Sequence, residues 1–186
     1  MIATARLRLR PCRESDKPAF ATILNTPAMT AELGGVRSRA ATDALVDKRI
    51  ADQAQHGFSY WAVELRDTGE LIGTCGIRLA NNYPGTPVAG MHEMGWRIAE
   101  AYWGRGYATE AARATLDWAW ATLPVTTIAA WTTAQNRASW RVMERLGMTR
   151  APELDFIRPG HAPGDPLGAM RVYTIARPAA AQLPGS

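Results

Sequence analysis

The stretch EMGWRIAEAYWGRGYATEAARATLDWAW, residues 93–120, contains a turn that decides how the rest of the chain folds. Its first residues alternate as in a β-strand, and residues 108–120 place small and apolar side chains on one face of a helix. Gly104 and Gly106 separate the two parts. A helix N-terminus carries unpaired N–H groups and a partial positive charge, and glycines beside it let a phosphate reach those groups. The stretch predicts either a phosphate-binding turn or a tight turn without a ligand.

Two well-known phosphate-binding loops do not match this turn. A dinucleotide-binding fingerprint needs a third glycine where Thr109 stands, and it needs a parallel sheet, whereas the strands before the turn are predicted to form a meander. A Walker loop needs Gly-Lys-Ser/Thr, which the sequence lacks. The turn therefore belongs to neither nucleotide-binding class.

The composition is that of an ordinary globular protein with a basic surface. The chain has 186 residues, of which 47% are hydrophobic and 20% charged, and its formal net charge is +4. Its basic residues, nearly all arginines, are scattered, so they suit a small anionic ligand at least as well as nucleic acid. No apolar run approaches the ~20 residues that span a bilayer, and the N-terminus lacks an apolar signal core. We expect a cytoplasmic protein that binds neither nucleic acid nor membrane.

Two cysteines, Cys12 and Cys75, lie far apart in the sequence without metal-ligand spacing. We expect both to be buried, reduced thiols and predict no metal site.

The predicted elements follow the order strand, helix, helix, three meandering strands, helix, strand, helix and two strands. This order indicates an α+β fold with a local strand-helix-strand unit in its second half. We expect residues 1–177 to form a single domain and residues 178–186 to form a flexible C-terminal tail. The predicted strands cover residues 5–11, 59–66, 70–79, 88–99, 126–133, 149–158 and 168–177, and the predicted helices cover residues 13–25, 42–57, 108–120 and 136–148.

Two segments, EMGWRIAEAYWGRGYATEA (residues 93–111) and AAWTTAQNRASWRVMERLGM (residues 129–148), carry a resemblance to a known family. The chain resembles the GNAT superfamily of acetyl-CoA-dependent N-acetyltransferases, and it looks most like the RimJ/RimL-like branch of ribosomal-protein-alanine acetyltransferases. The superfamily's pyrophosphate signature, Arg/Gln-x-x-Gly-x-Gly/Ala, aligns with residues 103–108, with Trp103 in place of the first residue. The opening ARLRLRPCRESD matches the same branch, so the resemblance extends over residues 5–177.

The resemblance implies a GNAT fold and acetyl-CoA as cosubstrate, without a metal. The fold would be a mixed, mostly antiparallel sheet of about six to seven strands flanked by about four helices. The fourth and fifth strands would splay apart to admit the pantetheine arm, and the amides of residues 105–109 would hold the pyrophosphate. The implied cofactor-binding residues are Trp96, Arg97, Ile98, Trp103, Gly104, Arg105, Gly106, Tyr107, Ala108, Thr109, Asn136 and Ser139.

The resemblance also implies catalytic roles. Glu93 would be the general base that takes the amine proton, because a partly desolvated carboxylate suits that task; Gly95 beside it would leave room for water or substrate. The alternative is a strand glutamate paired with an arginine. Met143 stands where many members carry a proton-donating tyrosine, so the resemblance assigns Ser139 to polarise the thiol and Asn136 to bond the pantetheine. The alternative for both is helix capping.

The acceptor would be a primary amine, on a protein N-terminus or on a small molecule, attacked directly in a ternary complex. We expect specificity to come from the first two helices, residues 29–41 and the loop 158–168. A homodimer is one assembly that the sequence allows. The alternative function is a non-catalytic acyl-CoA-binding regulator or sensor of the same fold. Nucleic-acid binding would not explain the glycine turn.

Overall fold

The computed structural model describes residues 1–179, so most of the tail expected at residues 178–186 lies outside the described residues. The chain divides into two compact units. The first unit comprises residues 1–78 and 95–115, and the second comprises residues 79–94 and the chain from residue 116 onward. Three elements run from one unit into the other: a strand that ends at Leu79, a strand that ends at Ile98 and a helix that begins at Tyr107.

The strands of the first unit pair antiparallel in the order in which they follow one another. In strand β2 the side chains of Leu7 and Leu9 are buried, and they alternate with exposed or charged neighbours as the sequence pattern predicts. The turn between β3 and β4 is closed by Gly69 in a left-handed conformation. The bounds are β1 Ile2–Ala3, β2 Leu7–Arg10, β3 Tyr60–Leu65 and β4 Leu71–Leu79, whose last residue enters the second unit.

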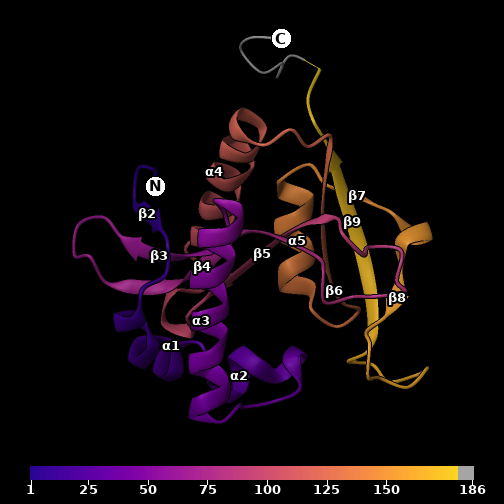
Figure 1. The fold of residues 1–186 in the computed structure, drawn as a ribbon, viewed down its shortest axis with the longest axis horizontal. Helices are drawn as coiled ribbons and strands as arrows, with labels where there is room; N and C mark the ends of the chain where they lie inside the picture. Colours follow the sequence, from indigo (N-terminus) through magenta and orange to yellow (C-terminus); the bar gives the residue numbers. More distant parts are fainter. Residues whose placement is uncertain (180–186) are drawn as a thin grey trace. The chain divides into compact units, whose positions relative to one another are not determined.

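The helices of the first unit are α1 (Lys17–Ile23), α2 (Pro27–Thr30) and α3 (Arg39–His56). The helix α1 packs against α3 (Figure 1), and Phe20, Leu24 and Val46 share a buried cluster there. The helix α3 ends at Gly57, as predicted, but it begins earlier than predicted, because the Ser38 hydroxyl accepts a hydrogen bond from the Ala41 amide at 3.2 Å.

Residues 26–40, for which the sequence analysis predicts neither helix nor strand, contain a short helix and a 3₁₀ turn. The Thr26 hydroxyl accepts from the Met29 amide at 3.2 Å and starts α2, whose first residue is a proline. A 3₁₀ turn, Ala31–Leu33, follows directly. This segment of the first unit therefore has a regular, hydrogen-bonded backbone.

A buried ion-pair network fixes the start of the chain in the first unit. Arg10 donates two hydrogen bonds of 2.8 Å to Asp16 and one of 2.6 Å to Glu64, and all three residues are buried. Burial alone would raise the pKa of both carboxyl groups, but the hydrogen bonds from Arg10 outweigh it and hold the pKa of each below its ordinary value. The network depends on Arg10, because Asp16 would otherwise be a buried charge without its ion-pair partner, and Glu64 would keep only Arg8, which donates to it at 2.8 and 2.6 Å.

The second unit contains one parallel strand pair and an antiparallel group. Strand β5 is parallel to β6, with Glu93 opposite Ala129 as the single registered pair among the described residues. Strands β6 and β9 pair antiparallel along their whole lengths (Figure 1). The predicted strand 149–158 is interrupted by a 3₁₀ turn that begins at Pro152, because proline cannot donate to a ladder. The bounds are β5 His92–Ile98, β6 Thr127–Thr133, β7 Thr149–Arg150, β8 Phe156–Ile157 and β9 Ala169–Ala176.

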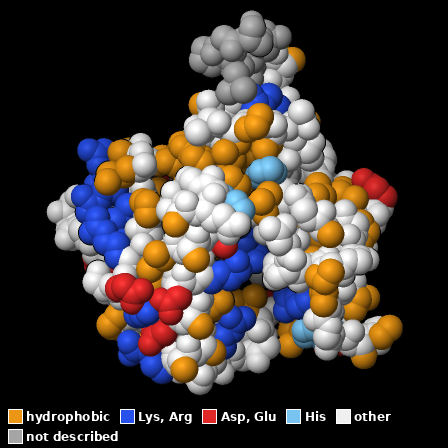
Figure 2. All heavy atoms as spheres, viewed as in Figure 1, with side chains coloured by type: hydrophobic (Ala, Val, Ile, Leu, Met, Phe, Trp, Pro, Cys, Tyr) orange, Lys and Arg blue, Asp and Glu red, His pale blue; other side chains and the backbone are white. Residues whose placement is uncertain are grey.

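Two helices follow the parallel strands, α4 (Tyr107–Thr122) and α5 (Arg137–Arg145). The mixed, mostly antiparallel pairing with one parallel pair confirms the predicted α+β class. Residues 1–179 hold nine strands and five helices, more than expected, because β1, β7 and β8 have two residues each and α2 has four. On the face drawn in Figure 2, Lys and Arg side chains occur in several separate places, in line with their scatter in the sequence.

Candidate active site

The glycine turn lies directly before α4 in the first unit. Gly104 and Gly106 have φ angles of +75° and +80°, which L-residues with side chains rarely adopt. A Cβ atom at Gly104 would meet nothing within 4 Å, and one at Gly106 would meet only Nη2 of Arg6 at 3.6 Å. The backbone conformation therefore requires these glycines, while the space beside them is left open by the protein itself.

The open space borders the unpaired end of α4. The first backbone hydrogen bond of the helix runs from the Glu110 amide to the Gly106 carbonyl at 3.0 Å. By helix geometry, the amides of Tyr107, Ala108 and Thr109 have no acceptor within the helix. Together with the partial positive charge of the N-terminus, they form a seat for an anion.

Arg6 holds the turn in place, a role that the sequence analysis missed. Its Nη1 atom donates to the Arg105 carbonyl at 3.0 Å, and its Nε atom donates to Glu110 at 2.7 Å. Its guanidinium lies 4.4 Å from the ring centroid of Tyr107. Thr4 also donates to Glu110 at 2.6 Å. Burial would raise the pKa of Glu110, but the hydrogen bonds from Thr4 and Arg6 lower it. The helix start therefore carries an ionised carboxylate that is paired with the half-exposed cation of Arg6.

The second half of β5 presents one backbone edge to β4 and the other away from it. The Ala99 amide donates to the Ile72 carbonyl of β4 at 2.8 Å. Because backbone groups alternate between the two edges of a strand, those of Arg97 face β4, and those of Trp96 and Ile98 face the opposite edge. The indole N–H of Trp103 donates a hydrogen bond of 2.6 Å to the Ile98 carbonyl.

Gly95 has a different role from the one expected. A Cβ atom there would lie 2.6 Å from the Tyr60 hydroxyl. The glycine therefore makes room for an aromatic side chain of β3, and the expectation that it leaves space for water or substrate is wrong.

The remaining predicted residues lie in the second unit. Glu93 is buried, with 8% of its surface exposed. The Asn136 side chain accepts from the Ser139 amide at 3.2 Å and donates to the Thr132 hydroxyl at 2.9 Å. Asn136 is therefore the cap of α5, which was the alternative reading, and its capping places Ser139 in the first turn. The Ser139 hydroxyl makes no hydrogen bond to any of the described residues.

Two positions narrow the chemistry of proton transfer in the second unit. Met143, which stands where a tyrosine was considered, has 1% of its surface exposed and packs in the core, so no proton donor comes from that position. Burial lowers the pKa of His92, which precedes Glu93 in β5. Of the positions assigned a catalytic role from the sequence, the Glu93 carboxylate and the Ser139 hydroxyl are therefore the candidates for acid and base work in this unit.

The structure thus groups the predicted residues in two sets. Trp96 to Ile98 and the turn 103–109 belong to the first unit, while Glu93, Asn136 and Ser139 belong to the second. Within residues 1–179, no group of three or more His, Cys, Asp or Glu side chains is placed to hold a metal ion. None of the helices in that range combines the length and apolar character that a bilayer crossing needs.

Comparisons with known proteins identify related sequences and folds. A family model described as an acetyltransferase (GNAT) domain matches residues 6–149. The uncharacterized protein YkkB of Bacillus subtilis is 33% identical over 151 residues, which cover 79% of this chain and 84% of that protein. An acetyltransferase structure from Agrobacterium tumefaciens is 33% identical, with a TM-score of 0.76 over 94% of this chain and 92% of the other. The ribosomal alpha-N-protein acetyltransferase RimL, solved with coenzyme A, shares the fold at 19% identity, with a TM-score of 0.72 over 93% and 95% of the two chains. The chain belongs to the GNAT acetyltransferase family.

Proposed function

We propose that the protein is an acetyl-CoA-dependent N-acetyltransferase of the RimJ/RimL-like branch. It would move the acetyl group to a primary amine, on a small molecule or a protein N-terminus, by direct attack in a ternary complex. The observation that carries the proposal is the open, left-handed glycine turn at the N-terminus of α4, in a chain of the GNAT family. Residues 1–177 would act as one domain in the cytoplasm, alone or as a homodimer.

The turn suits the diphosphate of coenzyme A. Glycine at position 106 leaves the approach free, and the amides of Tyr107, Ala108 and Thr109 supply the donors. Arg105 is exposed beside them, and Arg6 adds a second cation that also fixes the turn. Because Arg6 is paired with Glu110, Arg105 is the cation that would strengthen this anion site beyond what a helix end provides.

The free edge of β5 suits the pantetheine arm. The backbone of Trp96 and the Ile98 amide face away from β4, whereas the Ile98 carbonyl is already bonded to Trp103. Arg97 would not contribute through its backbone, which faces β4. Of the three residues implied by the resemblance, Trp96 and Ile98 would therefore bind the pantetheine arm through their backbone.

The chemistry needs a neutral amine and a stabilised leaving thiolate. The buried Glu93 carboxylate would take the proton from the acceptor ammonium, directly or through water. The amine nitrogen would then attack the thioester carbonyl carbon, the C–N bond would form, and the C–S bond would break, while the proton that the nitrogen loses on becoming an amide would leave with the sulfur as the free thiol of coenzyme A. The Ser139 hydroxyl, held in the first turn of α5 by Asn136, would donate a hydrogen bond to the departing sulfur. Holding both reactants in line lowers the barrier further.

Thiol release from acetyl-CoA tests the proposal. Purified protein is mixed with acetyl-CoA and a panel of N-terminal peptides, amino acids, polyamines and drug amines, and free coenzyme A is measured with a thiol reagent. We expect amine-dependent release with at least one class, and Glu93→Gln should slow it. Tight binding of coenzyme A without release for any amine would favour the sensor instead.

A further inference from the structure

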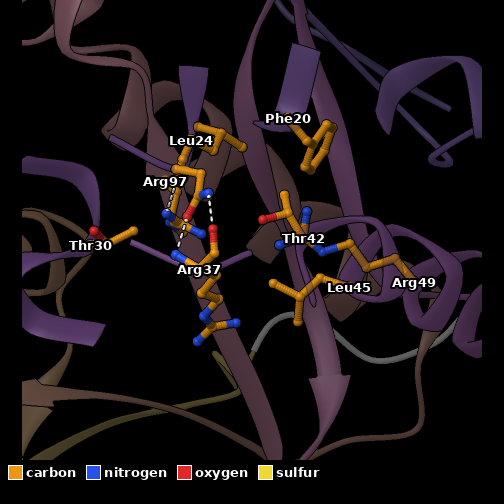
Figure 3. Close-up of a pocket in the computed structure, with 9 residues that line it drawn as sticks. Phe20, Leu24, Thr30, Arg37, Thr42, Leu45, Arg49 and Arg97 are labelled. Carbon is orange, nitrogen blue, oxygen red and sulfur yellow. Dashed lines mark hydrogen bonds between the residues drawn. The ribbon is translucent and has the colours of Figure 1, made fainter. Parts of the chain in front are cut away.

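A pocket in the first unit is lined by three arginines and by no acidic side chain. It lies between the connection after α1, the helix α3 and the strand β5. Arg37, Arg49 and Arg97 reach it from these three elements (Figure 3). None of the described residues that line the pocket is Asp or Glu. The pocket is therefore a cationic site without a protein counter-ion on its walls.

Arg97 is anchored by the protein but incompletely satisfied. Its Nη2 atom donates to the carbonyls of Leu24 and Met29, the latter at 3.3 Å. Its Nε atom is buried and has no hydrogen-bond partner among the described residues. Burial lowers the pKa of Arg97 to about 10, and the charges of Arg49 and Arg37 add to that effect. The side chain is held rigidly beside the pocket with one donor left over.

Arg49 is the deeper of the two buried cations. Only 9% of its surface is exposed, and its Nη1 atom has no partner within the described part of the chain. Its guanidinium stacks 4.9 Å from the ring centroid of Phe20 and 5.9 Å from that of Tyr60. In Figure 3 the side chain extends from α3 toward Thr42, into the pocket. Aromatic faces hold the cation, but they do not neutralise it.

Arg37 stands at the rim. Its backbone amide donates to the Asn25 side chain at 2.9 Å, and its carbonyl accepts from the same side chain at 2.8 Å. Its guanidinium is exposed and points away from Arg97 in Figure 3. A fixed backbone with a free, exposed side chain lets this arginine follow a ligand at the mouth of the pocket.

Two buried guanidinium groups with unused donors are costly unless an anion joins them. A carboxylate matches the planar fork of arginine and makes charge-assisted bonds to it. A polyamine or another acceptor with extra cations would instead be repelled. The apolar walls that Phe20, Leu24 and Leu45 provide suit a small side chain.

One wall of the pocket is β5, the strand whose edge the pantetheine arm would follow. Arg97 stands in β5 between Trp96 and Ile98, whose backbone faces the edge that suits the pantetheine arm. We propose that the pocket holds the carboxylate of the acceptor, and that the acceptor is a free amino acid whose α-amine receives the acetyl group. This inference rests on the proposed function, and it names the substrate class of that site.

Matched acceptors test this assignment. Each amino acid is compared with its amide and with its decarboxylated amine in the thiol-release assay. We expect kcat/KM to be about 10- to 150-fold higher for the acid, since one charge-assisted hydrogen bond of about 1.5–3 kcal/mol separates the members of a pair. Equal values within each pair would overturn the inference, and so would faster turnover of peptides with acidic residues after a free N-terminus than of any amino acid.

Substitutions of the pocket arginines test whether the preference for the free acid arises in the pocket. Arg49→Gln and Arg37→Gln should raise KM for amino acids with little change in kcat, and should leave the values for the amides unchanged. Arg39→Gln is the matched control, because Arg39 is exposed at the start of α3 and paired with Asp43 at 2.8 Å. An equal rise in KM for Arg39→Gln would show a long-range charge effect and overturn the placement. Arg37→Gln keeps the test available if Arg49→Gln does not fold.

A binding measurement separates this inference from the proposed function. Amino acids should raise the melting temperature of the coenzyme A-bound protein, and Arg49→Gln or Arg37→Gln should abolish the rise. If no amine releases thiol but this rise is seen, the catalytic proposal fails and the carboxylate pocket stands. If thiol is released from neutral amines but amino acids give no rise, the pocket assignment fails and the acetyltransferase stands.

Discussion

Replacing Gly106 by alanine separates the demands of folding from those of cofactor binding. The new Cβ atom would meet only Nη2 of Arg6, at an ordinary contact distance of 3.6 Å, so crowding costs nothing. The φ angle of +80° is the cost, about 1–2 kcal/mol for a residue with a side chain. For a chain of this size, that corresponds to a fall in Tm of roughly 2–8 °C.

The loss of coenzyme A affinity should be larger than this strain alone would produce. The methyl group would stand where a phosphate has to approach the amides of Tyr107 to Thr109. Losing one charge-assisted hydrogen bond costs about 1.5–3 kcal/mol, so Kd should rise roughly 10- to 150-fold. Isothermal titration with coenzyme A measures this change, and a thermal melt of the free protein measures the strain.

Gly57→Ala is the control for backbone strain. Gly57 ends α3 with a φ angle of +79°, and a Cβ atom there would also meet nothing within 4 Å. Both variants should lose similar stability, but only Gly106→Ala should lose affinity. If Gly106→Ala binds coenzyme A as the wild type does, the phosphate seat is misplaced. If Gly57→Ala loses affinity equally, the loss reflects strain and not the seat.

Three further substitutions address other parts of the molecule. Glu93→Gln should lower kcat by about 100-fold and leave coenzyme A affinity unchanged, and an unaltered kcat over the whole pH range would remove Glu93 as the base. Arg10→Met should lower the free energy of unfolding in urea by about 3–5 kcal/mol, because Asp16 loses its buried cation and Glu64 keeps only the half-exposed Arg8, and a neutral effect would contradict that reasoning. Since the folded-state pKa of both carboxyl groups is lowered, the wild-type protein should keep this stability above their ordinary pKa values of 3.8 and 4.5 and lose it as the pH falls through and below them, which urea titrations from pH 7 to pH 3 would show. Arg6→Ala should raise Kd for coenzyme A about 3- to 10-fold by loosening the turn and removing an exposed cation, and an unchanged Kd would show that the turn is rigid without it.

Local signals in the sequence predicted the glycine turn and most of the ends of helices and strands. Gly104 and Gly106 stand where a strand pattern changes to a helix pattern, and the structure gives both a left-handed backbone there. Gly57 ends α3 for the same reason. The start of α3 was missed because Ser38 and Thr42 are both good caps, and only tertiary contacts choose between them. Thr26 followed by a proline was a helix-start signal that the sequence analysis did not use.

Contacts between distant residues could not be predicted from a single sequence. Arg6 and Glu110 are 104 positions apart, and nothing in the spacing of either indicates their pairing. Gly95 was interpreted from its neighbour in the strand, but its partner is Tyr60 in another strand. The arginine pocket draws its side chains from three elements, so no motif marks it. Packing, rather than local pattern, decides each of these cases.

A crystal structure of the protein with coenzyme A bound is the most direct test of the phosphate seat. We expect diphosphate oxygens within about 2.7–3.2 Å of the amide nitrogens of residues 107–109, with Arg6 still bonded to the Arg105 carbonyl. A diphosphate bound elsewhere, with these amides facing solvent, would contradict the assignment of the turn.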